Sequence, residues 1–446
     1  MASKKKAKTL DVLLEEARVP EVEQPYELPE SWIWVKLSGF AECLDKFRKP
    51  INANERAKRL GDIPYYGATG QVGYIDDYLT DEHLVVLGED GAPFYDLYKS
   101  KSYIIEGKAW VNNHAHLLKS YYGIEGNEYL NYYLNQFNYH GYVSGTTRLK
   151  LTQKKMLEIP VPLPPKEVIS KIVMQIKTLF IKIENAKQLI AEAKGKILLE
   201  KAIYYKNTLS GKNLNNNERW KILKIEELIM PTRRSMTTGP FGTALKKTDY
   251  VVEGIPVLGI DSINNGEFIY KNKNFITQDK LKELTSYLVQ EDDIIISRSG
   301  TVGELCIVPK KTIPAIISTN IIKLTLNKEI ILPQFFVYMF LVEGTVKEQI
   351  RNLCKGSTRE FLNQTILKSI EFPVPTIDEQ EIIIEKMKNA INRFKIMEEF
   401  IDGKSLAFDK LKSSILSKAF KGELGTSDPI DESAIELLKS ALQENL

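Results

Sequence analysis

Residues 145–162 read GTTRLKLTQKKMLEIPVP, and residues 356–375 read GSTREFLNQTILKSIEFPVP. Both stretches give Gly-Ser/Thr-Thr-Arg, then Leu-x-Gln, then Pro-Val-Pro, and they differ in spacing only between the Gln and the first Pro. A Pro-x-Pro segment before a long periodic run predicts a boundary between a strand and a helix. The chain is therefore predicted to contain a tandem duplication with one such boundary in each copy.

The duplication extends upstream of these stretches, with a period of roughly two hundred residues. Glu30-Ser31-Trp32 opens the first copy, and Glu218-Arg219-Trp220 opens the second. The runs VVLGEDG at 85–91 and IIISRSG at 294–300 then lie at corresponding places. Short β-branched runs beside Gly, Pro and Asn are typical of strands and turns, so each copy is predicted to form a globular α/β body.

A long helix is predicted to follow each body. Apolar residues recur at spacings of three and four from Ile169 to Ile197 and from Ile383 to Ile415, with Lys404 filling the one gap. This alternation is typical of a coiled-coil seam. Because a single apolar stripe must be buried, we expect the two helices to pair. If they pair antiparallel, the two bodies lie at opposite ends of the helical rod. The alternative is that each helix packs on its own body.

The predicted fold class is α+β, with two tandem globular α/β bodies separated by two long helices that pair as an antiparallel coiled coil. The predicted boundaries are an N-terminal helical segment at 1–25, the first body at 26–164, the central helix at 165–212, the second body at 213–376, the C-terminal helix at 377–422 and a tail at 423–446. Segments 9–17 and 434–442 have amphipathic patterns. We expect these two helices to dock on partner subunits or near the junctions of bodies and helices.

Composition places the chain among folded proteins without a global basic signal. It has 446 residues, 43% hydrophobic and 27% charged, with a net charge of +3, so a nucleic-acid surface would have to be a local patch. Cys43, Cys306 and Cys354 lie far apart, which argues against a disulfide framework or a zinc cluster. No apolar run approaches the ~20 residues of a membrane span, and we expect a cytoplasmic protein without a membrane partner.

Two basic loops rich in Gly and Thr occupy corresponding places in the copies and are the candidate DNA-binding surfaces. Cations bind phosphates, glycine allows close approach of the backbone, and forked or amide side chains read base edges. The candidates in the first copy are Lys46, Arg48, Lys49, Arg56, Lys58, Arg59, Tyr65, Tyr66, Gly67, Thr69, His114, Thr147 and Arg148. The candidates in the second copy are Arg233, Arg234, Thr237, Thr238, Gly239, Lys246, Lys247, Arg298, Ser299, Thr301, Asn320, Thr358 and Arg359.

Each candidate also has a structural interpretation. The basic runs could be ordinary solvated loops, and Arg148 and Arg359 could close a turn by pairing with a helix carboxylate. His114 and His116 could share a metal if they lay on one strand, but no third ligand is evident, so no metal site is predicted. The aromatic residues from Tyr129 onward fall at helical spacings, which predicts a core-facing helix, matched by Phe335, Phe336, Tyr338 and Phe340 in the second copy.

The order of these motifs, given twice, resembles the specificity subunit of type I restriction-modification systems. Local similarities support this over essentially the whole chain: PYYGATG at 64–70, GPFGT at 239–243, ISRSGTVG at 296–303 and KAFKGEL at 418–424. The resemblance implies two target-recognition domains that read the halves of a bipartite, asymmetric double-stranded DNA site. It also implies helices that set the gap between the halves and dock two modification (adenine methyltransferase) subunits, which restriction (motor-nuclease) subunits join.

The chain itself is predicted to be non-catalytic. It lacks a Gly-x4-Gly-Lys-Ser/Thr phosphate loop, the Asn/Asp-Pro-Pro-Tyr/Phe segment with which such methyltransferases hold a flipped base, and His-Glu-x-x-His or Cys-x-x-Cys metal patterns. S-adenosylmethionine is therefore expected in the partner methyltransferases, with no cofactor in this chain. The alternative function is a coiled-coil scaffold with two protein-binding domains and no role on DNA.

Overall fold

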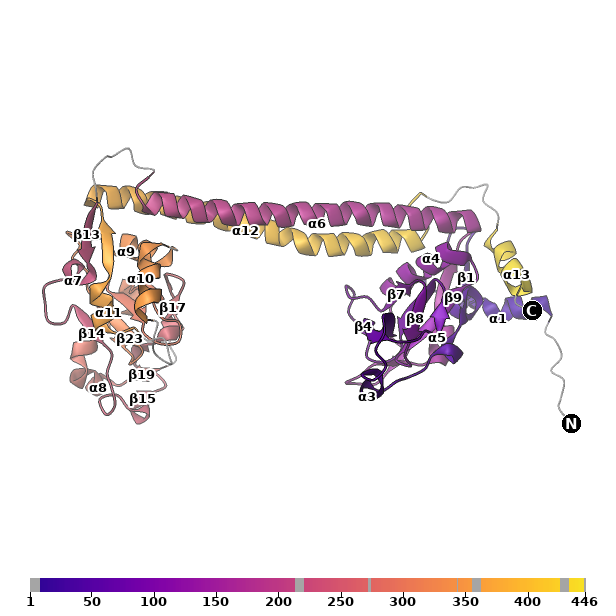
Figure 1. Ribbon diagram of the computed structural model, residues 1–446, viewed down its shortest axis with the longest axis horizontal. Coiled ribbons are helices and arrows are strands. Elements are labelled where there is room, and N and C mark those ends of the chain that lie inside the picture. The colour runs from indigo at the N-terminus through magenta and orange to yellow at the C-terminus, as the bar shows by residue number, and fades with distance from the viewer. Residues whose placement is uncertain are drawn as a thin grey trace. The chain divides into compact units, whose positions relative to one another are not determined.

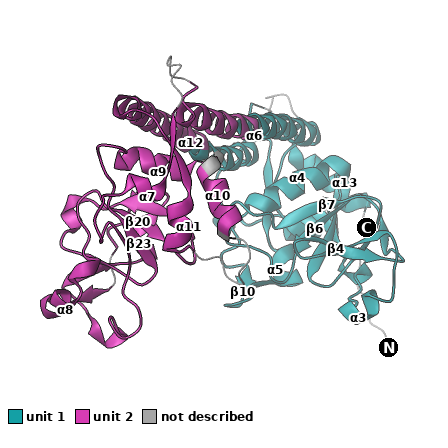
Figure 2. Ribbon diagram, turned by 60° about the vertical axis from the view of Figure 1, so that its left-hand side comes forward, with its two compact units in different colours: residues 1–190, 402–446 teal, residues 191–401 magenta. Residues whose placement is uncertain are grey.

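The computed structural model (Figure 1) describes residues 9–212, 220–271, 274–342, 344–354, 362–425 and 433–444, except for the side chains at positions 345, 354, 405 and 406. The chain forms two compact units, residues 1–190 with 402–446 and residues 191–401 (Figure 2). Each unit contains a sheet-bearing body and parts of two long helices. This confirms the predicted α+β class with two tandem bodies.

In unit 1, the first and last strands of the body pair with each other. β1 (Ile33–Lys36) pairs antiparallel with β12 (Pro160–Leu163), and Trp34 lies opposite Pro162. Because proline has no N–H, both prolines of β12 turn their backbone away from β1. Their carbonyls accept hydrogen bonds from the hydroxyls of Tyr129 and Tyr133. We call the Trp-containing segment that begins each body its tryptophan entry, and the Pro-Val-Pro segment that ends it the exit. In the first body, entry and exit therefore form one two-stranded ribbon.

Two four-stranded sheets make up the rest of the first body. The antiparallel sheet has the order β2 (Ala41–Cys43), β9 (Ala115–Ser120), β6 (Leu84–Gly88) and β7 (Ser102–Ile105). The mixed sheet has the order β4 (Gly70–Ile75), β3 (Ile63–Gly67), β8 (Lys108–Val111) and β5 (Thr80–Asp81), with β3 parallel to β8. The smaller elements are α2 (Leu37–Phe40), α3 (Ala53–Arg56), β10 (Val143–Ser144), β11 (Lys150–Leu151), α5 (Gln153–Leu157) and 3-10 turns at Glu21–Glu23 and Asp45–Phe47.

α4 (Gly123–Gln136) packs on the antiparallel sheet of the first body. Tyr129 and Tyr133 are buried, which confirms the predicted core-facing helix. The helix ends earlier than the aromatic pattern suggested, because Asn138 caps the N–H of His140 and Gly141 takes a φ of 85°. The aromatic residues beyond Gln136 therefore lie in a loop.

Unit 2 repeats this plan. β13 (Lys221–Lys224) pairs antiparallel with β24 (Glu371–Val374), with Ile222 opposite Pro373. The antiparallel sheet has the order β14 (Met236–Thr238), β23 (Ile321–Leu324), β20 (Ile294–Ser297) and β21 (Leu305–Ile307). The mixed sheet has the order β15 (Tyr250–Val251), β19 (Phe275–Ile276), β16 (Ile255–Leu258) and β22 (Ile316–Ile317), with β16 parallel to β22. The antiparallel sheet thus repeats the strand order of the first body, whereas the fourth strand of the mixed sheet lies on the other side: β5 pairs with β8 in the first body, and β15 pairs with β19 in the second.

The helix that corresponds to α4 in the second body is α9 (Pro333–Leu341), which buries Phe335, Phe336, Tyr338 and Phe340, as predicted. Phe336 stacks on Phe372 of β24, with ring centroids 4.9 Å apart. The other elements of unit 2 are α7 (Ile225–Leu228), β17 (Ile263–Asn264), β18 (Glu267–Phe268), α8 (Gln278–Glu283), α10 (Thr345–Cys354), α11 (Gln364–Ser369) and 3-10 turns at Lys247–Asp249, Ile260–Ser262, Thr285–Tyr287 and Lys310–Thr312.

The two long helices, α6 (Lys166–Leu209) and α12 (Ile377–Phe420), have 44 residues each (Figure 1). In unit 1, Lys187 pairs with Asp409 at 2.9 Å and Glu184 pairs with Lys412. In unit 2, Lys201 of α6 pairs with Glu398 of α12 at 2.9 Å, and the ring centroids of Tyr205 and Phe394 lie 5.9 Å apart. Higher numbers in α6 meet lower numbers in α12 in each unit, which is the predicted antiparallel pairing.

The apolar seam is not as continuous as predicted. Ile176 and Phe394 are buried, whereas Met397 is 39% exposed and Leu411 is 47% exposed. At these two levels the neighbouring ion pairs, rather than apolar side chains, join the helices. The end of α12 also packs on a globular body, because Phe420 makes edge contacts with two tyrosine rings of α4. Among the described residues, no helix is both long and apolar enough to cross a membrane.

The two terminal helices, α1 (Leu10–Ala17) and α13 (Ala434–Glu444), pack against each other in unit 1. The N–H of Ala434 donates to the carbonyl of Ser31 at 3.0 Å, so the pair lies beside the tryptophan entry. This agrees with the predicted position near a junction of body and helix. Their docking on partner subunits stays a prediction.

Each long helix ends at a glycine that packs against a tryptophan entry. Gly211 and Gly422 have φ values of 70° and 74°, in the left-handed region. A Cβ atom on Gly211 would lie 2.6 Å from Cζ2 of Trp220, and one on Gly422 would lie 2.5 Å from Cγ of Pro29. Both the backbone conformation and the lack of space therefore require glycine.

We expect Gly211→Ala to lower the free energy of unfolding by about 1–2 kcal/mol, because alanine is disfavoured in the left-handed region and here meets a ring. Gly195→Ala is the control, since Gly195 lies inside α6 with no atom within 4 Å of an added Cβ. That variant should gain roughly 0.5–1 kcal/mol from helix propensity. Urea unfolding of the full chain measures both, and equal stability of the two variants would contradict the close packing.

Candidate nucleic-acid interface

Four loops of the first body meet around a pocket of about 670 Å³. They are the turn between β3 and β4, the segment after β6, the connection from β8 to β9 and the Gly-Thr-Thr-Arg segment. Predicted candidates from three of these four stretches line the pocket: Gly67, Thr69, His114, Thr147 and Arg148. The fold thus brings together candidates that lie up to 81 residues apart in the sequence, from Gly67 to Arg148.

Arg148 is the most exposed charged group of this pocket. Its Nε lies 2.6 Å from Oδ1 of Asp90, and 60% of its side chain is exposed. Nδ1 of His114 lies 3.5 Å from the other oxygen of the same carboxylate. The structural alternative for Arg148 is therefore partly correct, because it pairs with a carboxylate, although that carboxylate belongs to a loop and not to a helix.

The second body has a pocket of about 630 Å³ beside β14, a different place from that of the first pocket. Four predicted candidates line it, namely Arg233, Arg234, Thr237 and Thr238. Met236, Phe241, Ser286, Tyr287 and Gln364 complete the lining and were not predicted. Two arginines and no carboxylate among these residues make this pocket more basic than the first.

Equivalent backbone contacts recur in the two bodies, after β6 in the first and after β20 in the second. The N–H of Glu89 donates to the carbonyl of His114 at 2.8 Å, and the carbonyl of Glu89 accepts from the Leu of the Leu-x-Gln motif at 2.8 Å. Arg298 makes the corresponding contacts with Asn320 and with the second Leu-x-Gln motif, both at 3.0 Å. Glu89 and Arg298 are therefore structurally equivalent, and the two bodies carry opposite charges at this position of a shared scaffold.

The two glutamines of the Leu-x-Gln motifs are also equivalent. Nε2 of Gln153 lies 3.1 Å from Sγ of Cys43 on β2, and Nε2 of Gln364 donates to Oγ1 of Thr238 on β14 at 2.8 Å. Each glutamine thus ties the loop after the Gly-Ser/Thr-Thr-Arg segment to an edge strand of its sheet. The sequence showed these glutamines as part of the duplicated motif, but it gave no signal of what they contact.

Comparison with known proteins assigns the duplication to a family. The type I restriction modification DNA specificity domain matches the chain twice, at residues 29–194 and 217–402. The chain belongs to this family. The matched regions are the two bodies with the beginnings of the helices that follow them, and they are called the first and second specificity domains below.

Curated relatives share this arrangement along most of their length. A putative type I restriction enzyme specificity subunit of Haemophilus influenzae is 26% identical over 381 residues, covering 84% of this chain and 91% of that protein. The type I restriction enzyme EcoBI specificity subunit of Escherichia coli is 23% identical over 435 residues, covering 89% of this chain and 86% of that protein. These relatives are DNA specificity subunits, which confirms the predicted class of DNA-recognition protein.

Solved structures have a similar fold. One chain, from work on complex assembly and conformational transition of the type I R-M system, has a TM-score of 0.66 at 15% identity and covers 90% of this chain. The HsdS subunit from Thermoanaerobacter tengcongensis has a TM-score of 0.58 at 15% identity, again covering 90% of this chain. Both structures are matched over 100% of their own length.

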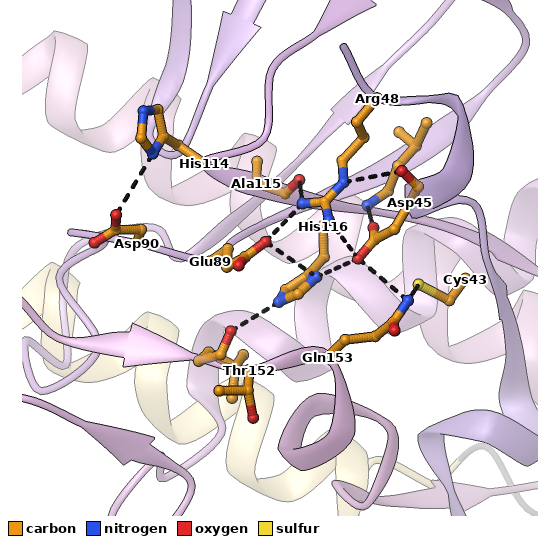
Figure 3. Close-up of polar contacts among 12 residues, drawn as sticks. Cys43, Asp45, Arg48, Glu89, Asp90, His114, Ala115, His116, Thr152 and Gln153 are labelled. Atoms are coloured by element: carbon orange, nitrogen blue, oxygen red, sulfur yellow. Dashed lines mark hydrogen bonds and ion pairs between the residues drawn. The ribbon is translucent and has the colours of Figure 1, made fainter. Parts of the chain in front are cut away.

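The first specificity domain corrects the prediction for Arg48, as Figure 3 shows. Its guanidinium lies 2.8 Å from Asp45 and 2.7 Å from Glu89, and only 13% of its side chain is exposed. It also donates to the carbonyl of Ala115. Because its donors are used inside the domain, Arg48 holds the scaffold together and is not placed to contact DNA.

His116 belongs to the same buried cluster. Its Nδ1 lies 2.7 Å from Oδ2 of Asp45, and its Nε2 lies 2.9 Å from the carbonyl of Leu151. Burial raises the pKa of Asp45, but hydrogen bonds from His116 and from the N–H of Leu117, with the charges of His116 and Arg48, lower it overall. The folded domain therefore favours the ionised carboxylate of Asp45.

The ligand atoms of Asp45, Glu89 and His116 lie within 4.8 Å of one another, which is the spacing of a metal site. His114 is not part of this set, because it faces Asp90 instead (Figure 3). The guanidinium of Arg48 already contacts both carboxylates, so a cation would have to displace an ion-paired arginine. The geometry is that of a neutralised ionic cluster.

The other candidates of the first domain divide by exposure. Tyr65 corrects the prediction, because it is 1% exposed and its hydroxyl faces the backbone of Ile51. Arg56 lies over the Tyr65 ring at 4.7 Å, and Arg59 lies over the Trp110 ring at 4.8 Å. Tyr66 is half-buried, and Lys46, Lys49 and Lys58 are exposed. Among these candidates the lysines are the most exposed, and Arg56, Arg59 and Tyr66 are partly exposed.

Two candidates of the second domain are corrected. Arg298 is 7% exposed and lies over the Phe241 ring at 4.9 Å, where burial lowers the pKa of its guanidinium. A Cβ on Gly239 would lie 1.9 Å from the carbonyl oxygen of Ser318, so this glycine is required by packing and not by DNA. Ser299 is half-buried, and Lys246, Lys247, Thr301 and Asn320 are exposed outside the pocket lining. Thr358 and Arg359 lie outside the described residues.

We expect Arg48→Ala to destabilise the first domain by about 3–5 kcal/mol, because it removes the guanidinium that pairs with the largely buried carboxylates of both Asp45 and Glu89. Arg148→Ala should change stability by less than about 1 kcal/mol, because its ion pair is exposed. Urea unfolding of both variants measures the difference. A loss of DNA affinity in Arg48→Ala at unchanged stability would instead restore the original prediction that Arg48 contacts DNA.

The lowered pKa of Asp45 predicts a dependence of stability on pH. The unfolded chain binds this proton more tightly, at an ordinary pKa of about 3.9. The stabilisation is therefore fully present above about pH 4 and is lost as the pH falls through the lower folded pKa. Asp45→Asn should be less stable than the wild type at pH 7, with a difference that shrinks at acid pH. A constant difference in unfolding midpoints from pH 7 to pH 3 would exclude this linkage.

Proposed function

We propose that the chain reads a bipartite, asymmetric double-stranded DNA site, with one half bound at the pocket of each specificity domain. The observation that carries this proposal is the pair of domains, which share equivalent backbone contacts but present pockets at different places with different side chains. Base edges are read by side chains, while a shared backbone fixes where those side chains lie. Two unlike pockets on one scaffold fit two unlike half-sites.

We propose that α6 and α12 set the unread gap and dock two modification subunits, which are adenine methyltransferases, and that motor-nuclease restriction subunits join them. Exposed apolar side chains along the helices support a docking role, including Leu199 at 62%, Ile396 at 58% and Phe400 at 66%. In this proposal S-adenosylmethionine is bound by the methyltransferases, and this chain supplies specificity without catalysis.

The methylation experiment combines the full chain with its modification subunit, S-adenosylmethionine and genomic DNA, and then maps the methylated adenines. We expect a split recognition site with a fixed unread gap, and no methylation by the chain alone. Methylation by the isolated chain would overturn the non-catalytic assignment. A continuous site without a gap would overturn the assignment of one half to each domain.

The binding experiment measures the affinity of the full chain for duplex DNA over a range of salt. Affinity should fall steeply with salt, and Arg234→Ala should reduce the slope by about one if Arg234 contacts a phosphate. Lys282→Ala is the matched control, since this lysine is exposed and pairs with Asp279 away from the pocket. A flat salt response of the wild type would favour a protein-binding scaffold.

A further inference from the structure

Asp90 is held rigidly at the edge of the first pocket. Its own N–H and that of Glu89 both donate to the carbonyl of His114, at 3.2 Å and 2.8 Å. The N–H of Gly91 donates to the carbonyl of Leu149 at 2.9 Å. Backbone hydrogen bonds thus fix the chain on both sides of Asp90. A carboxylate on this backbone has a defined position before any ligand arrives.

Asp90 contacts Arg148 in an orientation that leaves the end of the guanidinium available. The contact is made through Nε, at 2.6 Å from Oδ1, and 22% of the Asp90 side chain remains exposed. The arginine crosses Gly91, where an added Cβ would lie 3.3 Å from Nε. The two Nη groups form a forked pair of donors at the end of this side chain, which is 60% exposed.

We propose that Asp90 positions Arg148 to read a guanine in the half-site bound by the first specificity domain. This inference rests on the proposed function and names one base of the DNA site. A forked pair of N–H donors matches the O6 and N7 acceptors that guanine presents in the major groove. Asp90 is the positioning residue, and Arg148 is the residue that touches the base.

The ion pair between Asp90 and Arg148 is better explained by its effect on the orientation of the Arg148 side chain than by a contribution to the stability of the fold. An exposed pair contributes little to folding, whereas holding a long side chain in its bound geometry lowers the entropy lost on binding. Ser299 of the second domain takes the place of Asp90, because it follows the equivalent residue Arg298. The second domain therefore lacks this carboxylate. We expect an arginine positioned by a carboxylate to read a base in one half-site only.

The test selects binding sites for the full chain from duplex DNA with randomised positions, followed by sequencing. The wild type, Arg148→Ala, Arg148→Lys and Asp90→Ala are compared. We expect one guanine position in one half-site whose preference falls by roughly tenfold or more in both Arg148 variants, since lysine keeps the charge but lacks the fork. Asp90→Ala should weaken the same preference less, and the other half-site should stay unchanged.

Lys154→Ala is the matched control for lost charge, because Lys154 is an exposed residue of the nearby helix α5. It should leave every base preference as in the wild type. Unfolding midpoints of all variants should agree, which separates loss of reading from loss of structure. A change of preference only in variants that are also unfolded would overturn the inference.

If Arg148 contacts only a phosphate, Arg148→Ala will weaken binding equally for all sequences, reduce the salt slope by about one and leave all base preferences intact. That result would overturn the guanine assignment while the proposed function stands. An unchanged guanine preference in Asp90→Ala would overturn the positioning role. If the wild type selects no sequence at all, the proposed function fails together with the inference.

Discussion

The antiparallel pairing of the first and last strands of each body holds the rest of the structure in place. β1 with β12, and β13 with β24, bring the entry and exit of each body side by side. A long helix therefore leaves each body at the side where the chain entered it. The left-handed glycines that end the helices then meet the tryptophan entries, so that each unit contains the start of one long helix and the end of the other.

The sheets carry loops whose backbone is nearly the same in both domains and whose chemistry is not. Glu89 and Arg298 occupy equivalent positions and have opposite charge. The glutamate is neutralised within an ionic cluster, whereas the arginine is stacked over Phe241. A scaffold that accommodates opposite charges at this largely buried position can also present different side chains on its surface. That property suits a protein whose two domains read different sequences.

The duplication made most of the fold predictable from the sequence. The Pro-Val-Pro exits, the tryptophan entries and the helix periodicity each depend on local rules that a sequence displays directly. The matching places of the basic Gly/Thr-rich loops in the two copies were also visible in the sequence, but their convergence at a pocket was not. The sequence pattern overestimated the burial of the apolar seam at Met397 and Leu411, which are partly exposed and lie beside ion pairs between the helices.

The candidate site was less predictable, because burial depends on partners that are distant in sequence. Arg48 looked like a phosphate-binding cation, but Glu89, which neutralises it, comes from another strand 41 residues away. Tyr65 lies beside basic residues in the sequence, yet the alternation of β3 turns its ring inward. The acceptor Asp90 was visible as part of VVLGEDG, but only the fold shows that it meets Arg148.

The ribbon that closes the first body also has a consequence for how copies of the chain meet. The outer edge of β12 lacks N–H groups at Pro160 and Pro162, and the carbonyls of both prolines already accept from tyrosine hydroxyls. An incoming strand finds no N–H donor at either proline and meets carbonyls that already accept hydrogen bonds, so this edge is poorly suited to extending the sheet. The edge therefore protects the ribbon against edge-to-edge association between copies of the chain.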